Sequence, residues 1–246
     1  MNQQIYWHTT THMPGEENTI TPLPEKVDVA VIGGGYTGLS AARTLAKRGV
    51  NVAVLETETI GWGASSRNGG MTLTGLKLGL QTVIKRYGRD NARRLFQCSI
   101  ESVDIVEQIV KEENIDCGFA RYGHLLTASK HAHYEGFKAE VDFMAKEFNH
   151  AVRLVPQKDL KSEIGSTVYH GALVDEVSGG LNPAQFVAGV AGASARAGAT
   201  LCARARVTKL ERASSPLSMG QKRFFIQTKR GNLEAESVLV ATSGYT

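Results

Sequence analysis

A glycine-rich segment near the start of the chain has the residue types and spacing to bind a dinucleotide. Gly33, Gly35 and Gly38 form the pattern G-x-G-x-x-G. In this pattern the first glycine permits a tight turn, the second lets a pyrophosphate approach the backbone, and the third lets a helix pack closely on a strand. Glu56 follows Gly38 by 18 residues, close to the ~20 expected for an acid that binds a ribose diol. An adenosine dinucleotide site is therefore predicted, and FAD and NAD share this fingerprint.

A second glycine-rich segment, residues 61–70, lies just beyond Glu56. It reads Gly-Trp-Gly-Ala-Ser-Ser-Arg-Asn-Gly-Gly, and Arg67 is its only cation. A nicotinamide site does not need such a loop here. A flavin site does, because backbone and small side chains must follow the long cofactor toward its isoalloxazine ring. The alternative is an ordinary surface loop. The loop therefore favours FAD.

The elements around the first motif are those that such a site requires. Residues 27–32 form a short apolar, β-branched run typical of a buried parallel strand. Residues 39–48 predict a helix that ends at Gly49, and residues 50–55 predict a second strand. This is one βαβ unit in about 30 residues. A helix N-terminus placed in this way favours an anion such as pyrophosphate.

Further elements follow from hydrophobic spacing and capping signals. Residues 90–114 predict a long amphipathic helix with Asp90 as its N-cap. Asn182 and Pro183 predict the start of a helix over 184–197, with Gly198 as its stop. An antiparallel hairpin is expected around residues 229–232. The other predicted elements are a helix over 132–148 and strands over 119–128, 152–155, 168–174, 200–211, 223–229 and 233–242.

Composition excludes several classes of protein. The chain has 246 residues, with 28 Lys and Arg against 24 Asp and Glu, so its net charge of +4 is too weak to argue for nucleic acid. With 42% hydrophobic and 21% charged residues it can bury a core. The three cysteines are irregularly spaced and fit a reducing compartment. No apolar run approaches the ~18–20 residues of a membrane span, so we expect a cytoplasmic protein.

Other candidate residues have ordinary structural interpretations. His131 and His133 lie at the start of a helical pattern, where their side chains diverge, so no metal site is predicted. His124 and His170 lie on strand-like segments and are expected to be surface or satisfied histidines. Cys98 and Cys117 have no neighbour in sequence that would lower a thiol pKa, and a structural role is expected for both.

The two glycine-rich segments together resemble a known family. Residues 27–70 are similar to the amino-terminal half of the D-amino acid oxidase (DAO) family of FAD-dependent oxidoreductases. The loop 61–70, with Tyr6 and Trp7 upstream, most resembles the γ-glutamylputrescine oxidase-like branch. Residues 181–183, 206–211 and 238–245 are similar to later segments of that family. Because family members continue well beyond this length, the chain resembles a fragment or a shortened product.

The resemblance implies oxidation of a C–N bond, in which a hydride moves from the carbon beside an amine to flavin N5 and the imine is hydrolysed. Oxygen or another acceptor would reoxidise the flavin. Arg67 is the candidate for ring electrostatics or substrate placement, and the alternative is that it binds only backbone carbonyls. Some relatives attach flavin through His or Cys, and this loop contains neither, so non-covalent FAD is expected. The expected cofactor contacts are Gly33, Gly35, Tyr36, Thr37, Gly38, Glu56, Thr57, Gly63, Ala64, Ser65, Arg67, Asn68, Gly69, Gly70, Val207, Ala241, Thr242 and Gly244.

The predicted fold is α/β, with a Rossmann-type FAD-binding domain and an inserted, partial α+β substrate domain. The FAD-binding domain is expected over 27–85 and 176–246, the substrate part over 86–175, and a surface arm, pinned by Tyr6 and Trp7, over 1–26. The expected partners are a small-molecule amine or amino acid and an electron acceptor, without nucleic acid. Two alternatives stay open: an NAD-dependent dehydrogenase, and a truncated FAD-binding fragment without catalysis of its own.

Overall fold

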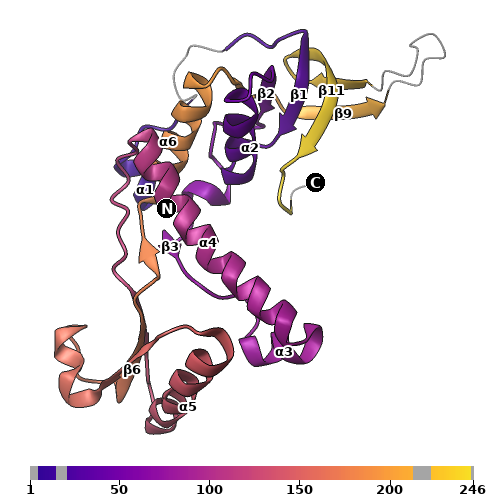
Figure 1. Cartoon of the computed structure of the whole chain (residues 1–246). Helices are drawn as coiled ribbons and strands as arrows, with labels where there is room; N and C mark the ends of the chain where they lie inside the picture. The colour runs from indigo at the N-terminus through magenta and orange to yellow at the C-terminus, as the bar shows by residue number, and fades with distance from the viewer. Residues whose placement is uncertain (1–4, 15–20, 213–222, 245–246) are drawn as a thin grey trace. The chain divides into compact units, whose positions relative to one another are not determined.

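The computed structural model describes residues 5–14, 21–212 and 223–244, and they divide into two compact units (Figure 1). Unit 1 comprises Met1–Gly69, Ile109–Cys117 and Asn182–Thr246, and unit 2 comprises Gly70–Gln108 and Gly118–Leu181, as far as these ranges are described. The bounds differ from the predicted domains. Residues 70–85 and 176–181 lie in unit 2, whereas 109–117 and the described part of the N-terminal arm lie in unit 1. Residues 1–4 and 15–20 of that arm, and Tyr245, lie outside the described residues.

Unit 1 is built on a six-stranded sheet with the order β8-β2-β1-β11-β10-β9. The first four of these strands are parallel, and β10 runs antiparallel to both of its neighbours. The parallel strands form because β-branched, apolar side chains can be buried on both faces of the sheet, and all four residues of β2 are buried. The bounds are β1 (Lys26–Ile32), β2 (Val52–Leu55), β8 (Thr200–Cys202), β9 (Val207–Arg212), β10 (Phe224–Thr228) and β11 (Gly231–Val240).

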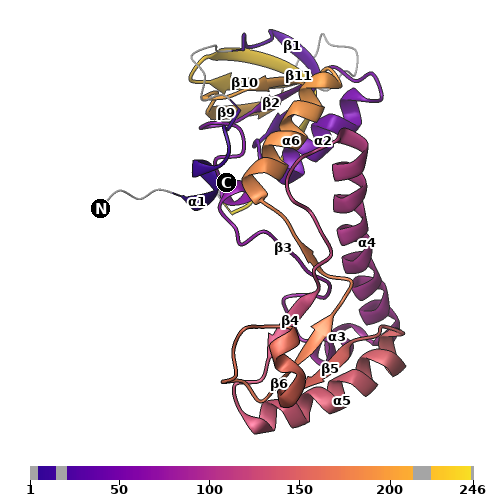
Figure 2. The same ribbon diagram turned by 90° about the vertical axis from the view of Figure 1, so that its left-hand side faces the viewer.

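Helices α2 (Tyr36–Ala46) and α6 (Pro183–Arg196) pack against each other and against the parallel strands (Figure 2). Small residues allow this close approach, since Ala42 and Ala46 of α2 lie on the valines of β1 and β2. The buried Ser194 hydroxyl donates to the Leu39 carbonyl of α2 at 2.9 Å. The predicted cap of α6 is confirmed, because the Asn182 side chain accepts hydrogen bonds from the first-turn amides of that helix.

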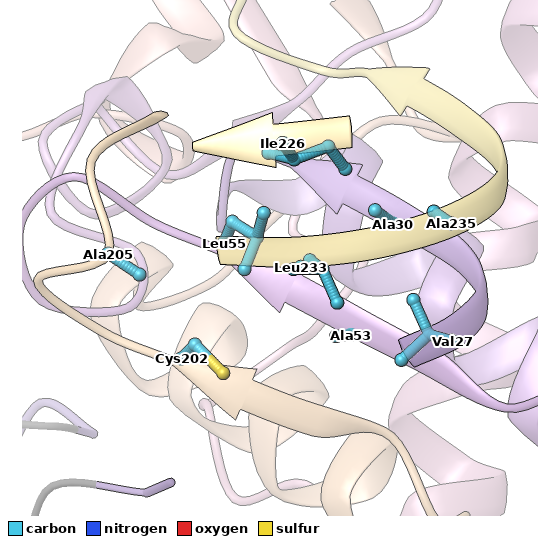
Figure 3. Packing of buried hydrophobic residues seen from close by; sticks show 9 residues of the cluster. All are labelled: Val27, Ala30, Ala53, Leu55, Cys202, Ala205, Ile226, Leu233 and Ala235. Atoms are coloured by element: carbon cyan, nitrogen blue, oxygen red, sulfur yellow. The ribbon is translucent and has the colours of Figure 1, made fainter. Parts of the chain in front are cut away.

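A second core lies where the antiparallel strands meet the parallel ones (Figure 3). Ile226 of β10 and Leu233 of β11 are fully buried and pack in one cluster with Ala30 and Leu55 of the parallel strands. The predicted hairpin is confirmed, since β10 and β11 pair from Thr228 opposite Gly231 outward. This packing holds the first half of β11 against the sheet while its second half pairs with β1.

Unit 2 contains short strands and several helices. Strands β4 (His124–Thr127), β6 (Gly171–Asp175) and β5 (Arg153–Pro156) form an antiparallel sheet in that order, and β3 (Met71–Thr72) pairs with β7 (Gly179–Gly180). The predicted helix over 132–148 is α5 (His131–Phe148). The sequence did not indicate α3 (Leu80–Tyr87), β3, β7 or the 3-10 helix η2 (Gln157–Ser162). In the described ranges no helix has both the length and the apolarity that a membrane span requires.

Three details of the predicted elements were wrong. Asp90 is not an N-cap, because α4 (Arg89–Glu113) begins one residue before it. Its carboxylate lies in the first turn instead, where it interacts favourably with the positive end of the helix dipole. The strand predicted over 119–128 is confined to 124–127, since Gly123 has a left-handed φ of 77°. The strand predicted over 200–211 is divided into β8 and β9, because Arg204 adopts a φ of 55° and turns the chain.

A buried polar cluster ties β6 of unit 2 to its neighbours. The Asp175 carboxylate accepts hydrogen bonds from His150 Nε2 at 3.1 Å, from the Val177 amide at 3.0 Å and from the Thr74 hydroxyl. Burial alone would raise the pKa of Asp175, but the hydrogen bonds from His150 and Thr74 outweigh it and lower that pKa to about 2. The Asp175 carboxylate is therefore charged and accepts several hydrogen bonds inside unit 2.

We expect Asp175→Asn to lower the free energy of unfolding at pH 7 by about 1–3 kcal/mol, because His150 and Thr74 lose their charged acceptor. The folded-state pKa of about 2 lies below the ordinary 3.8. The stabilisation is therefore complete above pH 4 and disappears as the pH falls toward 2. Urea unfolding at pH 7, 5 and 3, followed by circular dichroism, measures the difference between wild type and variant. The matched control is Glu176→Gln, whose side chain is 59% exposed. An equal loss in the control, or a difference unchanged at pH 3, would contradict this account.

Candidate functional site

The turn between β1 and α2 is fixed by two glycines that have no room for a side chain. Gly33 has a φ of 111°, and a Cβ there would overlap the carbonyl oxygen of Ala241, which follows β11. A Cβ on Gly38 would overlap the carbonyl oxygen of Gly33 itself. The Ala241 amide donates to the Ile32 carbonyl at 2.8 Å. The end of β1, the end of β11 and the first turn of α2 therefore meet at the carboxyl edge of the parallel strands.

The N-terminus of α2 lies at this edge and suits an anion. Gly35 is its N-cap and offers no side chain, and the first turn contains no acidic residue. The Tyr36 amide donates to the Ser65 hydroxyl at 3.0 Å, and Thr37 is in the same turn. A helix N-terminus of this kind carries a partial positive charge and unpaired N–H groups. Gly35 faces Ser65, since a Cβ on Gly35 would lie 2.9 Å from that hydroxyl oxygen.

Glu56 follows β2 at the same edge. Its Oε2 accepts a hydrogen bond from the Gly34 amide at 2.7 Å, and its Oε1 accepts one from the Glu58 amide at 3.1 Å. The side chain is partly exposed and Thr57 beside it is exposed. The backbone carbonyl of Glu56 accepts from the Ala205 amide at 2.7 Å, which holds the segment that leads into β9 and Val207 beside Glu56.

The loop 61–69 contains its own internal contacts. Arg67 Nε donates to the Trp62 carbonyl at 2.5 Å, and the guanidinium carbon lies 3.9 Å from the centroid of the Trp62 ring. Asn68 Nδ2 donates to the Ala64 and Ser65 carbonyls, each at 3.1 Å. Within the described part of the chain, the Nη atoms of Arg67 donate to no acceptor. Its exposed guanidinium is thus held by stacking while two nitrogens are available.

The Tyr36 side chain contacts helix α6. Its hydroxyl donates to the Pro183 carbonyl at 3.1 Å, and its ring lies 5.3 Å from that of Phe186 in α6. Burial raises the pKa of Tyr36 to about 12. The Tyr36 backbone N–H therefore binds Ser65 of the loop, and its side chain joins α2 to α6.

Comparison with known proteins places this geometry in a family. Residues 28–246 match the DAO family, described as FAD dependent oxidoreductase. The chain belongs to the DAO family of FAD-dependent oxidoreductases. It is 31% identical over 243 residues to gamma-glutamylputrescine oxidoreductase of Escherichia coli K12, covering 97% of this chain and 55% of that protein. It is 26% identical to glycine oxidase of Geobacillus kaustophilus over 91% of this chain and 56% of that one.

Solved structures with the DAO fold agree with the architecture. Glycine oxidase from Geobacillus kaustophilus superposes with a TM-score of 0.69 at 23% identity, covering 89% of this chain and 55% of that one. L-Amino acid deaminase from Proteus myxofaciens gives a TM-score of 0.72 at 18% identity, covering 91% and 47%. The α/β fold predicted from the sequence is confirmed. The chain spans about half the length of the relatives that it matches.

FAD, the cofactor of the DAO family, fits the residues present at the β1–α2 turn. The cradle exists because Gly33 and Gly38 leave only backbone there, and the helix N-terminus above it lacks a competing acid. Thr242 continues from Ala241, with its amide nitrogen 3.4 Å from the position of a Gly33 Cβ. The other predicted contacts lie along the two segments: Gly63 as N-cap of the 3-10 helix η1 (Ala64–Ser66), Gly69 at the end of unit 1, Gly70 as the first residue of unit 2, and Gly244 in the turn after β11.

The N-terminal segment has more contacts with this candidate site than the sequence predicts. Trp7, in helix α1 (Tyr6–Thr9), donates from Nε1 to the Asn68 carbonyl at 2.9 Å, and His8 Nε2 lies 2.8 Å from the Ser66 hydroxyl. The expected pinning by Tyr6 is not seen, because Tyr6 is 69% exposed, although its ring packs edge-on against Trp7. Nothing in the sequence pattern joins His8 to a serine 58 residues away.

The remaining candidate residues lie elsewhere. His131 and His133 are in the first turn of α5, and His124 and His170 are in unit 2. Among the described residues, no three His, Cys, Asp or Glu side chains gather as metal ligands would. Cys117 is buried and Cys98 is exposed, while burial raises the pKa of the Cys202 thiol.

We expect Gly38→Ala to destabilise unit 1 by about 3 kcal/mol or more, because the new methyl must push the first turn of α2 away from β1. The matched control is Gly192→Ala in α6, where a Cβ meets only the flexible end of Arg196 at 3.3 Å. That control should be neutral or stabilising, by up to about 1 kcal/mol. Thermal unfolding of both variants checks this. Equal effects of the two substitutions would show that the close approach is not a constraint.

Proposed function

We propose that this chain binds FAD without a covalent bond and supports oxidation of a C–N bond in an amine or an amino acid. The single observation that carries the proposal is the glycine turn at the carboxyl edge of parallel strands, with Glu56 beside it, in a chain of the DAO family. Crevices at this edge of open α/β sheets are where such ligands bind. Family membership favours FAD over the NAD alternative.

Each part of the site has a task in this proposal. FAD, when bound, supplies a hydride acceptor for the carbon attached to the amine nitrogen, and water then hydrolyses the imine. The N-terminus of α2 holds the pyrophosphate, and Glu56 accepts hydrogen bonds from the ribose diol. The loop 61–70 follows the cofactor toward its ring, and it contains no His or Cys to form a covalent link.

The substrate class is proposed from chemistry shared by the relatives. The names of two of them, gamma-glutamylputrescine oxidoreductase and glycine oxidase, each refer to a compound that carries an amine. An amine or amino acid is therefore the substrate class to test, with oxygen or another acceptor completing the cycle. Because the chain spans about half of those relatives, binding of FAD without turnover by this chain alone is the second candidate.

We expect the purified chain, mixed with FAD, to show a protein-bound flavin absorption spectrum, and acid precipitation to release all of the flavin. Glu56→Gln should weaken FAD binding about tenfold or more, because hydrogen bonds to a charged acceptor contribute about 1.5–3 kcal/mol. The matched control is Glu58→Gln, an exposed acid two residues away. Fluorescence titration gives the Kd of each. A wild-type chain that takes up no FAD would overturn the proposal, and an amine panel on the loaded protein separates turnover from binding alone.

Arg67 is proposed to place positive charge near the reduced flavin ring. If so, Arg67→Gln lowers the reduction potential of bound FAD by about 30 mV or more, which is about 1.4 kcal/mol for a two-electron couple. Dye equilibration measures this without any substrate. The control is Arg48→Gln, an exposed arginine beyond the end of α2. An unchanged potential would leave Arg67 with its loop contacts to Trp62 only.

A further inference from the structure

The described residues 5–14, which we call the N-terminal clamp, contact the loop 61–69 at two residues and the residue just before it at a third. Immediately before the loop, the Ile60 amide donates to the Pro14 carbonyl at 3.2 Å. At the centre, His8 Nε2 lies 2.8 Å from the Ser66 hydroxyl, and Trp7 Nε1 donates to the Asn68 carbonyl at 2.9 Å toward the far end. Three points between Ile60 and Asn68 are thus held by one short segment.

The clamp is itself anchored outside the loop. Met13 is buried with 1% exposure, and a Cβ on Gly61 would lie 3.0 Å from its terminal methyl and 2.8 Å from Val187 of α6. Thr10 accepts a hydrogen bond from the Asn182 side chain at 3.2 Å, and α1 packs against α6 (Figure 2). The clamp therefore connects the loop to the core of unit 1.

The central contact is the most demanding. Ser66 is fully buried, and the His8 ring lies at hydrogen-bond distance from its hydroxyl. A buried hydroxyl that loses its partner is costly, so Ser66 favours the conformation in which the clamp is docked. The loop is also joined to the turn between β1 and α2, because the Gly61 amide donates to the Gly34 carbonyl at 2.9 Å and the Tyr36 amide donates to the Ser65 hydroxyl at 3.0 Å. The bonds from Arg67 Nε and Asn68 Nδ2 join loop residues to each other. The clamp therefore adds contacts at Ser66 and Asn68, in the part of the loop beyond Ser65.

We propose that the N-terminal clamp positions the loop 61–69 for FAD before the cofactor arrives, with Trp7 and His8 as its positioning residues. This rests on the proposed function. A loop that is already ordered loses less conformational entropy when a ligand binds, so the clamp raises FAD affinity without touching the cofactor. Loss of the two contacts should loosen the loop and leave the sheet of unit 1 intact.

The test compares the double variant Trp7→Phe/His8→Ala with wild type and with Thr9→Ala. Thr9→Ala is the matched control, because this exposed side chain on the same helix bonds, within the described residues, to the Tyr6 carbonyl and not to the loop. The variant Trp7→Phe/His8→Gln restores a donor near the position of Nε2. Two readouts are used. Trypsin cleavage after Arg67, the only cation of the loop, reports loop order in the cofactor-free protein. Fluorescence titration gives the Kd for FAD.

The double variant should be cleaved after Arg67 about tenfold faster and bind FAD about tenfold more weakly, with partial recovery for His8→Gln and no change for Thr9→Ala. Cleavage after the exposed Arg48 should stay slow, which separates a loosened loop from general unfolding. Unchanged cleavage and affinity, or faster cleavage with unchanged affinity, overturns the inference. If wild type binds no FAD, the proposed function fails, and cleavage then shows separately whether the clamp orders the loop.

Discussion

The close approach of two stretches of backbone, the first turn of α2 and the end of β1, is the constraint on which the rest of unit 1 depends. Only hydrogen at Gly38 and Gly33 allows α2, β1 and the residue after β11 to meet. Once they meet, the N–H groups of α2 open onto the carboxyl edge of the parallel strands, and the Gly34 amide comes within 2.7 Å of Glu56 Oε2. A site for a long anion follows from packing that no side chain could replace.

Much of this arrangement could be predicted from the sequence, because the signals are local. A β-branched run, three glycines at fixed spacing and an acid after the next strand all act within 30 residues, and the family match and the sheet topology agree with them. The Asn182 cap is local in the same sense, since its side chain reaches amides two and three residues away. The antiparallel β10–β11 hairpin was likewise indicated by its own turn residues.

Contacts between segments distant in the sequence could not be predicted from it. His8 contacts Ser66, which is 58 residues away, and Asp175 contacts Thr74, which is 101 residues away. No local sequence pattern at either residue of a pair predicts its partner. The break between β8 and β9 arises because the amides of Arg204 and Ala205 bond to the carbonyls of Glu58 and Glu56, a tertiary interaction that outweighs local strand propensity. Asp90 failed as a cap for a smaller reason: the helix simply begins one residue earlier.

The two halves of the candidate site, the β1–α2 turn and the loop 61–69, are therefore held by different kinds of interaction. The turn is fixed by steric exclusion between backbone atoms, which neither pH nor a change of neighbouring side chain can relax. The loop 61–69 is held by hydrogen bonds, both from the N-terminal clamp and with the turn between β1 and α2, each contributing about 1 kcal/mol. Proteins with the same turn can thus differ in how firmly their loops are set.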